Sequence, residues 1–277
     1  MSPSVVAVVL AAALMHATWN AIAHNIADRV AGFALMGISD LVVGGAIVSF
    51  AGSPGAAWPY VLISAGLHIV YALFLLLSYQ LGEFSQVYPL ARGIGPLIVG
   101  VVSIVALGKH LPAVQLAGVV LISAGLMGLV FVGGKPGRKQ LPALGAAAVT
   151  GVMIASYTVV DALGVTHGPL LAYIGWLFLS QGPVMPLVVL AQSKGRTVAR
   201  LRVHAGAGLL GGMVALGAYG LVLWAQTSGA LAPVAALREA SIVFGAFIGA
   251  LFLGEKLGHK RAIAAAVVVA GIVALTV

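Results

Sequence analysis

The chain has 277 residues, of which 61% are hydrophobic and only 7% are charged. Soluble domains carry about 25% charged residues, so this chain could not face water without exposing large apolar patches. Its net charge of +8 comes with no basic run interleaved with aromatic residues, which argues against a nucleic-acid partner. The absence of cysteine excludes disulfides and thiolate metal sites. We therefore expect an integral protein whose main partner is the lipid bilayer.

Ten apolar runs are long enough to cross the hydrocarbon core, which takes about 20 helical residues. They are expected at 3–24, 30–51, 57–80, 84–107, 112–133, 142–163, 169–192, 206–228, 232–253 and 259–277. Short connections rich in Gly, Pro, Ser and Lys separate several of them, for example around 52–55, 134–137 and 193–196. The pattern predicts an all-α integral membrane protein with ten transmembrane helices.

The basic residues are concentrated in the connections that alternate to one side of the membrane. That side carries Arg29, Lys135, Arg138, Lys139, Lys194, Arg196, Arg200, Arg202, Lys256, Lys260 and Arg261, and the opposite side carries Lys109 alone. Because short cytoplasmic loops are enriched in Lys and Arg, we expect the first side to face the cytoplasm. Both termini would then lie outside, in a multi-pass protein of the cell inner (plasma) membrane.

An internal repeat relates the two halves of the chain at an offset of 146 residues without gaps. The matched residues include Gln80 and Gln226, Arg92 and Arg238, Leu107-Gly108 and Leu253-Gly254, Leu111 and Leu257, and Ala124-Gly125 and Ala270-Gly271. Each half holds five helices, an odd number, so equivalent helices must cross the membrane in opposite directions. We expect one five-helix repeat at 1–133, a basic cytoplasmic linker at 134–141 and a second, inverted repeat at 142–277.

Inverted repeats are typical of secondary transporters, in which the two halves exchange inward-open and outward-open shapes around a central site. This symmetry favours alternating access for a small-molecule substrate. An importer or a lipid-linked sugar flippase of the same fold remains an alternative. An intramembrane enzyme that uses Asp40 and Asp161 is disfavoured, because an asymmetric catalytic site does not need a duplicated chain. A passive channel is disfavoured because rings of like polar residues are absent.

Three segments carry a resemblance to a known family. The sequences ALRE at 236–239, LGE at 253–255 and SYTVVD at 156–161 resemble the EamA branch of the drug/metabolite transporter superfamily. Residues 16–20, HATWN, follow the Trp-Gly pattern of that family only loosely. The resemblance implies a ten-helix basket with a central cavity and export of small metabolites. Among its members the chain is similar to the YddG-type exporters of aromatic amino acids, which implies amino acids as substrates.

Charged residues inside the apolar runs are informative, because each costs about 2.5–3.5 kcal/mol near the bilayer centre. Arg92 and Arg238 lie about two turns inside their helices, which start on opposite sides, so we expect them at mirrored depths, one toward each entrance. Each could bind a substrate carboxylate or anchor a gate, or serve as a structural arginine paired with an acid. Asp40, Asp161 and Glu239 are the candidate partners, and an unpaired acid could instead carry a proton in a coupled cycle.

Polar and aromatic residues recur at helical spacing on single faces, as the lining of a cavity requires. The candidates for the cavity are His16, Trp19, Asn20, His68, Tyr71, Tyr79, Tyr88, Tyr157, Trp176 and Tyr219, together with the two arginines. Plain helix packing is the alternative for the tryptophans and Tyr157, and a histidine with an ordinary hydrogen bond is the alternative for His16 and His68. Pro96 marks either a bendable point of the fourth helix or a rigidly packed kink.

The sequence shows no nucleotide-binding loop, zinc motif or nucleophile elbow. We therefore expect no catalytic residues, no metal and no cofactor. The sequence leaves the oligomeric state open and is compatible with a monomer.

Overall fold

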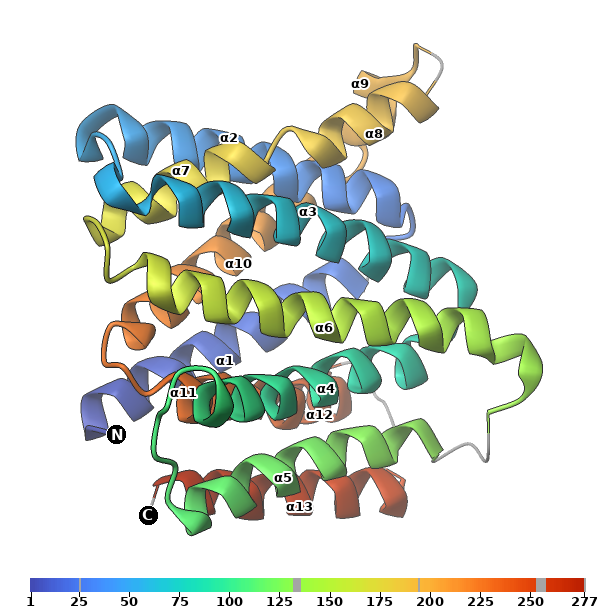
Figure 1. The fold of residues 1–277 in the computed structure, drawn as a ribbon. Coiled ribbons are helices and arrows are strands. Elements are labelled where there is room, and N and C mark those ends of the chain that lie inside the picture. Colours follow the sequence, from blue (N-terminus) through green and yellow to red (C-terminus); the bar gives the residue numbers. More distant parts are fainter. Residues whose placement is uncertain (25, 132–135, 194, 253–257, 277) are drawn as a thin grey trace.

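The computed structural model describes residues 1–24, 26–131, 136–193, 195–252 and 258–276, and these residues form helices without any β-strand. The first half holds α1 (Pro3–His24), α2 (Arg29–Ala51), η1 (Gly55–Ala57), α3 (Trp58–Leu81), α4 (Phe84–Val105), α5 (Ala113–Gly128) and η2 (Leu129–Phe131). The second half holds η3 (Arg138–Gln140), α6 (Leu141–Gly164), α7 (Leu170–Gln181), α8 (Val184–Gln192), α9 (Thr197–Arg202), α10 (Ala205–Gln226), α11 (Leu231–Leu237), α12 (Ala240–Phe252) and α13 (His259–Thr276). Figure 1 shows how these helices lie roughly along one common direction.

Nine helical segments in the described part of the chain are long and apolar enough to cross a membrane. They correspond to the first nine of the ten expected runs. The remaining run forms α13, whose apolar part, Ala262–Thr276, is shorter than the others. Lipid offers no hydrogen bonds, so a backbone that crosses it must form its hydrogen bonds internally, as a helix does. The nine long apolar helices therefore support the expectation of an integral membrane protein.

Two of the expected helices are interrupted. The seventh run divides into α7 and α8 at Gly182-Pro183, where proline removes a backbone donor. The ninth run divides into α11 and α12 at Arg238-Glu239, where no Gly or Pro signals a break. The fourth run behaves differently, because α4 continues through Pro89 and Pro96 without interruption.

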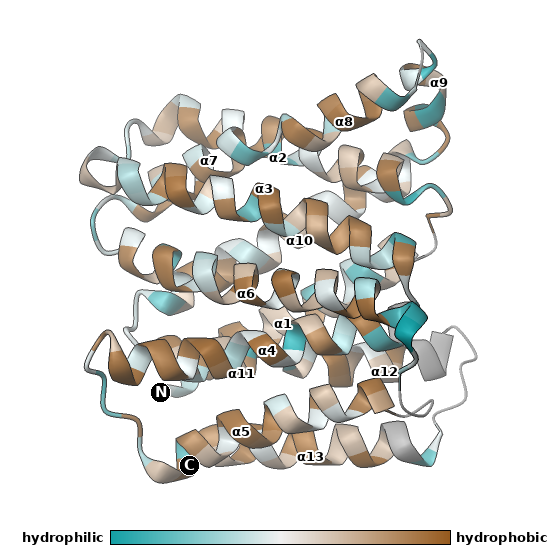
Figure 2. Cartoon of the chain, turned by 45° about the vertical axis from the view of Figure 1, so that its right-hand side comes forward, coloured by the Kyte–Doolittle hydropathy of each residue, from teal (hydrophilic) through white to brown (hydrophobic). Residues whose placement is uncertain are grey.

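The helices pack in pairs that bring together distant parts of the sequence. α3 packs against α6, α1 against α10, α2 against α7, and α5 against α13, and Figure 1 shows the last pair side by side. Large hydrophobic side chains such as Phe50, Leu62 and Val105 point outward and are exposed. Hydropathy follows the same arrangement, with apolar residues along the helices and hydrophilic ones strongest at α9 and nearby connections (Figure 2). Such a surface is suited to lipid.

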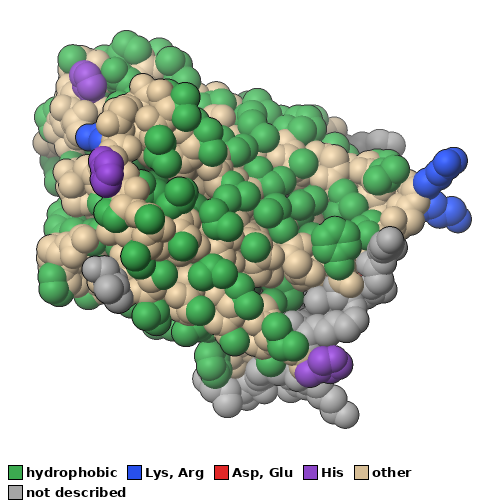
Figure 3. All heavy atoms as spheres, turned by 60° about the horizontal axis from the view of Figure 1, so that its bottom comes forward, with side chains coloured by type: hydrophobic (Ala, Val, Ile, Leu, Met, Phe, Trp, Pro, Cys, Tyr) green, Lys and Arg blue, Asp and Glu red, His purple; other side chains and the backbone are tan. Residues whose placement is uncertain are grey.

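Both termini lie at the same end of the molecule, opposite to α9 and to η3 (Figure 1). On the face of Figure 3, Lys, Arg and His side chains lie only near the ends, and the middle is free of them. The connections that carry Lys135, Lys194 and Lys256 fall outside the described residues. The described basic residues of α9 and η3 therefore lie at the end that lacks the termini, as the charge pattern predicted.

Candidate functional site

Three charged side chains meet where α11 ends and α12 begins. Arg92 of α4 donates from Nε to Glu239 Oε2 at 2.7 Å, and its Nη2 donates to Ser241 Oγ at 3.1 Å. Arg238 approaches the other carboxylate oxygen of Glu239 from its Nε, at 3.8 Å. Arg92 and Arg238 are buried and Glu239 is fully buried. The break in the ninth run thus places two cations and one anion together, with a net charge of +1.

The expectation that the two arginines guard opposite entrances is wrong. Both contact the same carboxylate, Glu239, because α4 and α11 pack against each other. Two helical turns correspond to about 11 Å. Two residues that each lie this far from opposite faces of a hydrocarbon core about 30 Å thick are both near the middle of the core. Long arginine side chains close the remaining gap.

Glu239 confirms the expectation that an acid neutralises an arginine, but the other two acids do not take part. Asp40 accepts a hydrogen bond from Gln181 Nε2 at 3.0 Å, on the far side of α2 where it meets the break between α7 and α8. Asp161 is bonded to tyrosines instead of arginines. Among the described residues, Glu239 alone therefore carries the countercharge of the buried arginines.

Arg238 is less completely paired than Arg92. Its Nε and Glu239 Oε1 are buried without a hydrogen-bond partner among the described residues, since 3.8 Å is too long for a hydrogen bond. A buried donor without an acceptor costs about 1–3 kcal/mol, more when it is charged. An acceptor from outside the chain would satisfy it, so the guanidinium of Arg238 is a candidate anion site.

An aromatic cluster lies beside these charges. His68 stacks on Tyr157 with ring centroids 3.9 Å apart, and it meets Tyr219 and Tyr71 edge to face at 5.2 and 6.4 Å. The charge of Arg238 acts on His68, Tyr157 and Tyr219, which places the cluster next to the break. Four residues from α3, α6 and α10 that were predicted as cavity residues are thus brought together.

Asp161 closes the cluster at the side away from the arginines. This fully buried carboxylate accepts a hydrogen bond from Tyr173 Oη at 2.6 Å and another from Tyr219. Tyr173 was not among the predicted site residues. It reaches Asp161 because Gly164 leaves room for its ring; a Cβ at Gly164 would lie 2.4 Å from it.

Tyr88 of α4 and His16 of α1 also lie near the arginines. The guanidinium of Arg92 lies over the ring of Tyr88, 6.0 Å from its centroid, within the range of a cation–π contact. The charges of both arginines act on His16, whose Nδ1 accepts a hydrogen bond from Trp19 Nε1 at 3.0 Å.

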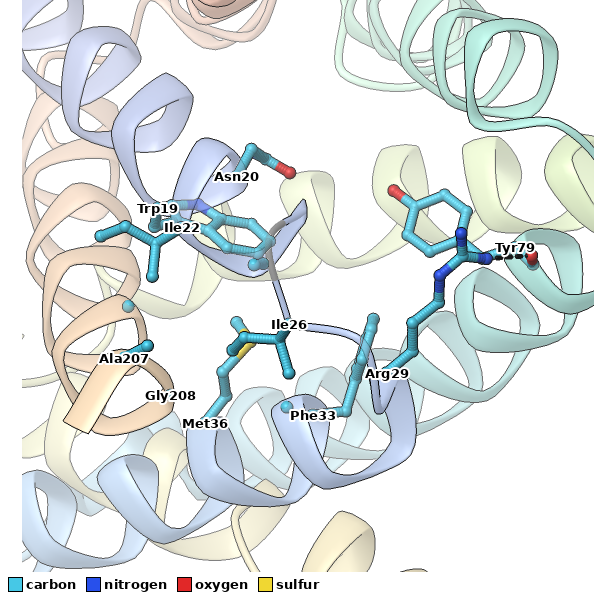
Figure 4. Close-up of a pocket in the computed structure, with 13 residues that line it drawn as sticks. Trp19, Asn20, Ile22, Ile26, Arg29, Phe33, Met36, Tyr79, Ala207 and Gly208 are labelled. Carbon is cyan, nitrogen blue, oxygen red and sulfur yellow. Dashed lines mark hydrogen bonds between the residues drawn. The ribbon is translucent and has the colours of Figure 1, made fainter. Parts of the chain in front are cut away.

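A pocket opens where α1 ends and α2 begins, at the end of the molecule that carries α9. Its lining includes Trp19, Asn20 and Tyr79 from the predicted set, together with Arg29, Phe33 and Met36. Figure 4 shows Arg29 lying across the pocket with its guanidinium against Tyr79. Arg29 donates a hydrogen bond to the backbone carbonyl of Tyr79 and lies over its ring. Sequence reasoning used Arg29 only for membrane orientation and missed its place in the pocket.

An ion pair lies next to this pocket, outside the membrane-spanning segments. Asp28 caps α2 by accepting from Ala31 N at 3.1 Å, and it is paired with Arg200 of α9, whose Nη2 donates to it at 2.9 Å. The hydrogen bonds from Arg200 lower the pKa of Asp28 below its ordinary value. The same bonds raise the pKa of Arg200. The pair ties α9 to the residue that precedes Arg29.

Trp176 lies apart from the other predicted cavity residues. Its Nε1 donates to the carbonyl of Gly52 at 2.9 Å and its ring packs on Trp58, with centroids 4.7 Å apart. Gly52 follows α2 and Trp58 begins α3, so Trp176 lies at a helix end, in the position of an interfacial tryptophan. Pro96 lies within the continuous helix α4, next to Gly95, which packs closely on Ile154 of α6.

The described residues include no group of three or more metal-ligating side chains close enough to hold a metal ion. What the site offers is an incompletely paired buried cation, Arg238, a buried carboxylate, Asp161, and an aromatic surface beside them. Such a set can bind and orient an amphipathic solute.

Comparisons with known proteins agree with this arrangement. One solved crystal structure, whose title names no function, has the same fold with a TM-score of 0.75 at 19% sequence identity, over 100% of this chain and 97% of its own. No curated protein matches the chain in sequence. Residues 141–277 match the EamA-like transporter family. The second half of this membrane protein is therefore an EamA-like transporter domain.

Proposed function

We propose that the chain is a secondary transporter that exports small organic metabolites, amino acids and aromatic amino acids among them, by alternating access. The single observation that carries this proposal is the interrupted ninth run, at which Nε of the buried Arg238 has no hydrogen-bond acceptor among the described residues. Interrupted helices near the bilayer midplane are where transporters of this kind bind their substrates.

Ten helices in two inverted repeats supply the mechanism in this proposal, and the packing of the helices supports it. When each helix is exchanged for its counterpart in the other half, the contact of α3 with α6 becomes that of α10 with α1. In the same way, the contact of α4 with α6 becomes that of α12 with α1, and that of α2 with α10 becomes that of α7 with α3. Three further contacts each join a helix to its own counterpart, so the exchange leaves them unchanged. They are the contacts of α2 with α7, α5 with α13 and α4 with α11. All nine contacts are present.

A close approach of α5 and α13 repeats the same relation at the level of single residues. A Cβ on Gly118 would lie 2.8 Å from the carbonyl oxygen of Gly271, and a Cβ on Gly125 would lie 3.3 Å from that of Ala264. The offset of 146 converts the first pair into the second. An axis in the membrane plane that relates repeats at 1–133 and 142–277, joined by a linker at 134–141, accounts for both contacts.

The chemistry of the central site supports a substrate with a carboxylate and an aromatic or apolar side chain. A carboxylate fits the planar donors of a guanidinium, and the net positive charge of Arg92, Glu239 and Arg238 favours an anion. The rings of Tyr71, Tyr157 and Tyr219 offer an aromatic surface beside it. Export is the direction that the resemblance to amino acid exporters implies.

We place the protein in the cell inner membrane with both termini outside the cytoplasm and with no other subunit or cofactor required. The pocket that contains Arg29 then opens to the cytoplasm. A substrate entering there meets Tyr79, and the charges of Arg29 and Arg92 both act on Tyr79, so the pocket leads toward the central arginines.

Counterflow in proteoliposomes tests the proposal. Vesicles loaded with one unlabelled amino acid at a time are diluted into its labelled form, and a carrier gives a transient accumulation of label that a channel or an enzyme does not give. We expect counterflow for phenylalanine, and a loss of at least tenfold in Arg238→Gln. Arg202→Gln, which changes an exposed arginine of α9, is the matched control. Absence of counterflow for every amino acid tested would overturn the substrate assignment, and full activity of Arg238→Gln would overturn the site.

A further inference from the structure

His68 has one nitrogen fixed and one nitrogen free. Its Nδ1 lies 2.9 Å from the backbone carbonyl oxygen of Ser64 and 3.2 Å from Ser64 Oγ. A carbonyl only accepts, so Nδ1 carries the hydrogen and Nε2 of the neutral ring has a lone pair. No described residue provides a hydrogen-bond partner for Nε2. Because His68 keeps 9% of its surface exposed, a proton or a ligand can still reach the ring.

The surroundings of His68 contain charges of both signs. Asp161 acts on it from α6 and Arg238 from the break in the ninth run, while Tyr219 meets its ring edge to face and donates to Asp161. The titratable and charged groups that face this cluster are Tyr71 on α3, Tyr88 and Arg92 on α4, Tyr157 and Asp161 on α6, Tyr173 on α7, Tyr219 on α10, and Arg238 and Glu239 at the break. Asp161 is the anion next to His68, since Glu239 is paired with Arg92.

We propose that His68 is the proton-binding group of a proton-coupled exchange, in which a proton on Nε2 and the ammonium group of the substrate compete for the negative charge of Asp161. This inference rests on the proposed function, because it takes the substrate to be an amino acid. In this proposal the carboxylate of the substrate lies on Arg238, and the ammonium group of the substrate lies on the side of the aromatic cluster where Asp161 is.

Charge repulsion makes the two cations exclude each other. An imidazolium at His68 and an ammonium group beside it would place two positive charges next to one carboxylate, in a site where water does not screen them. A proton taken up at Nε2 from one side of the membrane is therefore released when the substrate binds. Exclusive binding of two ligands to one carrier gives antiport, so a proton that enters the cell drives the amino acid out.

The experiment uses the full-length protein in proteoliposomes with an acidic interior, which contain pyranine to report the internal pH. Labelled phenylalanine is the probe. With one proton exchanged per substrate, a gradient of one pH unit supports accumulation of up to about tenfold, and the interior becomes alkaline as label enters. Counterflow is measured in parallel without a pH gradient, and it depends only on the proposed function.

His68→Gln keeps hydrogen-bonding capacity and removes the titration. We expect this variant to retain measurable, slower counterflow while its accumulation ratio falls to 1 and its pyranine signal disappears. His167→Gln is the matched control, since His167 lies exposed against Tyr60 at the end of α6, and both signals should match the wild type. Gradient-driven accumulation by His68→Gln would overturn the assignment of His68.

A second measurement keeps the proposal falsifiable if His68→Gln does not fold. Calorimetric titration of the wild-type protein with phenylalanine, in two buffers of different ionisation enthalpy, reports the protons released on binding. We expect the release of close to one proton for each phenylalanine bound, at a pH low enough that His68 is protonated in the free protein. Counterflow without proton release would overturn the coupling and leave the transport function standing. Absence of counterflow would overturn the proposed function together with this inference.

Discussion

At the scale of single residues, the ion pairs around Glu239 connect the two halves of the chain. Arg92 comes from the first half and Glu239 from the second, 147 residues later, and Arg238 stands at the position equivalent to Arg92. The counterpart of Glu239 in the first half is Gly93. The two arginines at equivalent positions thus share one carboxylate that the repeat does not duplicate, and one positive charge remains.

We predict that Glu239→Gln lowers the stability of the protein strongly. Removal of one partner leaves buried arginines without a countercharge, which costs about 3–5 kcal/mol. The thermal unfolding midpoint in detergent measures the loss, and Glu83→Gln, at an exposed position before α4, is the control. Replacement of all three residues, Arg92→Leu with Arg238→Leu and Glu239→Leu, should recover much of the stability, because no buried charge is then left unpaired. Equal midpoints for Glu239→Gln and Glu83→Gln would contradict this role.

Residue types were predictable here and their partners were not. A charged residue in an apolar run indicates a buried role, so Arg92, Arg238 and Glu239 could be identified from the sequence. Which acid pairs with which arginine depends on how α4 meets the ninth run, and sequence spacing does not contain that information. Tyr173 and Arg29 were missed because one resembles an ordinary packing residue and the other an orientation signal.

At the scale of helices, the cap of α2 carries a pH-dependent contribution. The pKa of Asp28 is lower in the folded protein because of its hydrogen bonds to Arg200. The ionised carboxylate therefore stabilises the fold fully above the pKa of an aspartate in the unfolded chain, about 3.9. The contribution is lost as the pH falls through the folded pKa.

We predict that Asp28→Asn keeps the helix cap but loses the ion pair, which lowers the free energy of unfolding by about 0.2–1 kcal/mol. Asp28→Ala loses both the cap and the ion pair and should lower it by about 1 kcal/mol more. The stability gap between the wild type and Asp28→Asn should shrink from pH 4 toward pH 2. Unfolding midpoints across that range measure it. A gap that stays constant would show that the Arg200 pair does not account for the lowered pKa.

The pair α5 and α13 depends on close backbone contact. A Cβ on Gly271 would lie 2.8 Å from the carbonyl oxygen of Gly118 and 2.7 Å from the side chain of Ile122. We predict that Gly271→Ala destabilises the protein relative to Gly128→Ala, by about 1–3 kcal/mol for the forced separation. Gly128 has open space where its Cβ would lie. Unfolding midpoints measure the difference, and equal values would show that α13 can move freely against α5.

Helix boundaries were well predicted, whereas neither helix interruption was. Long apolar runs fix where a chain crosses lipid, since the backbone must bond within each helix. The break at Gly182-Pro183 has a residue-level cause, whereas α4 tolerates Pro96 because it packs closely on α6. The break at Arg238-Glu239 has no local signal, because buried ion pairing determines it.

At the scale of the whole molecule, the naturally cysteine-free chain makes orientation directly testable. We predict that Lys109→Cys reacts with a membrane-impermeant maleimide in intact cells, whereas Arg138→Cys reacts only after permeabilisation, because basic connections are retained in the cytoplasm. The unmodified chain is the control for background labelling. The reverse pattern would invert the proposed orientation.

The sequence predicts an inverted relation between the halves, and the exchange of helix contacts supports that proposal. The sequence could not indicate that both arginines lie on one carboxylate. With the two cations together, we propose one central binding site where the sequence suggested two gates. Opening of this site to one side of the membrane or the other then depends on how the two halves move around it.

Alternating exposure of the centre is the central claim, and a single cysteine measures it. Ser241 is buried and bonded to Arg92, and Ser241→Cys is a small change there. A membrane-impermeant thiosulfonate is added to right-side-out and to inverted vesicles, with and without phenylalanine. We predict reaction from both sides, slowed by phenylalanine in each case. Reaction from one side only would contradict alternating access around Arg238 and Glu239.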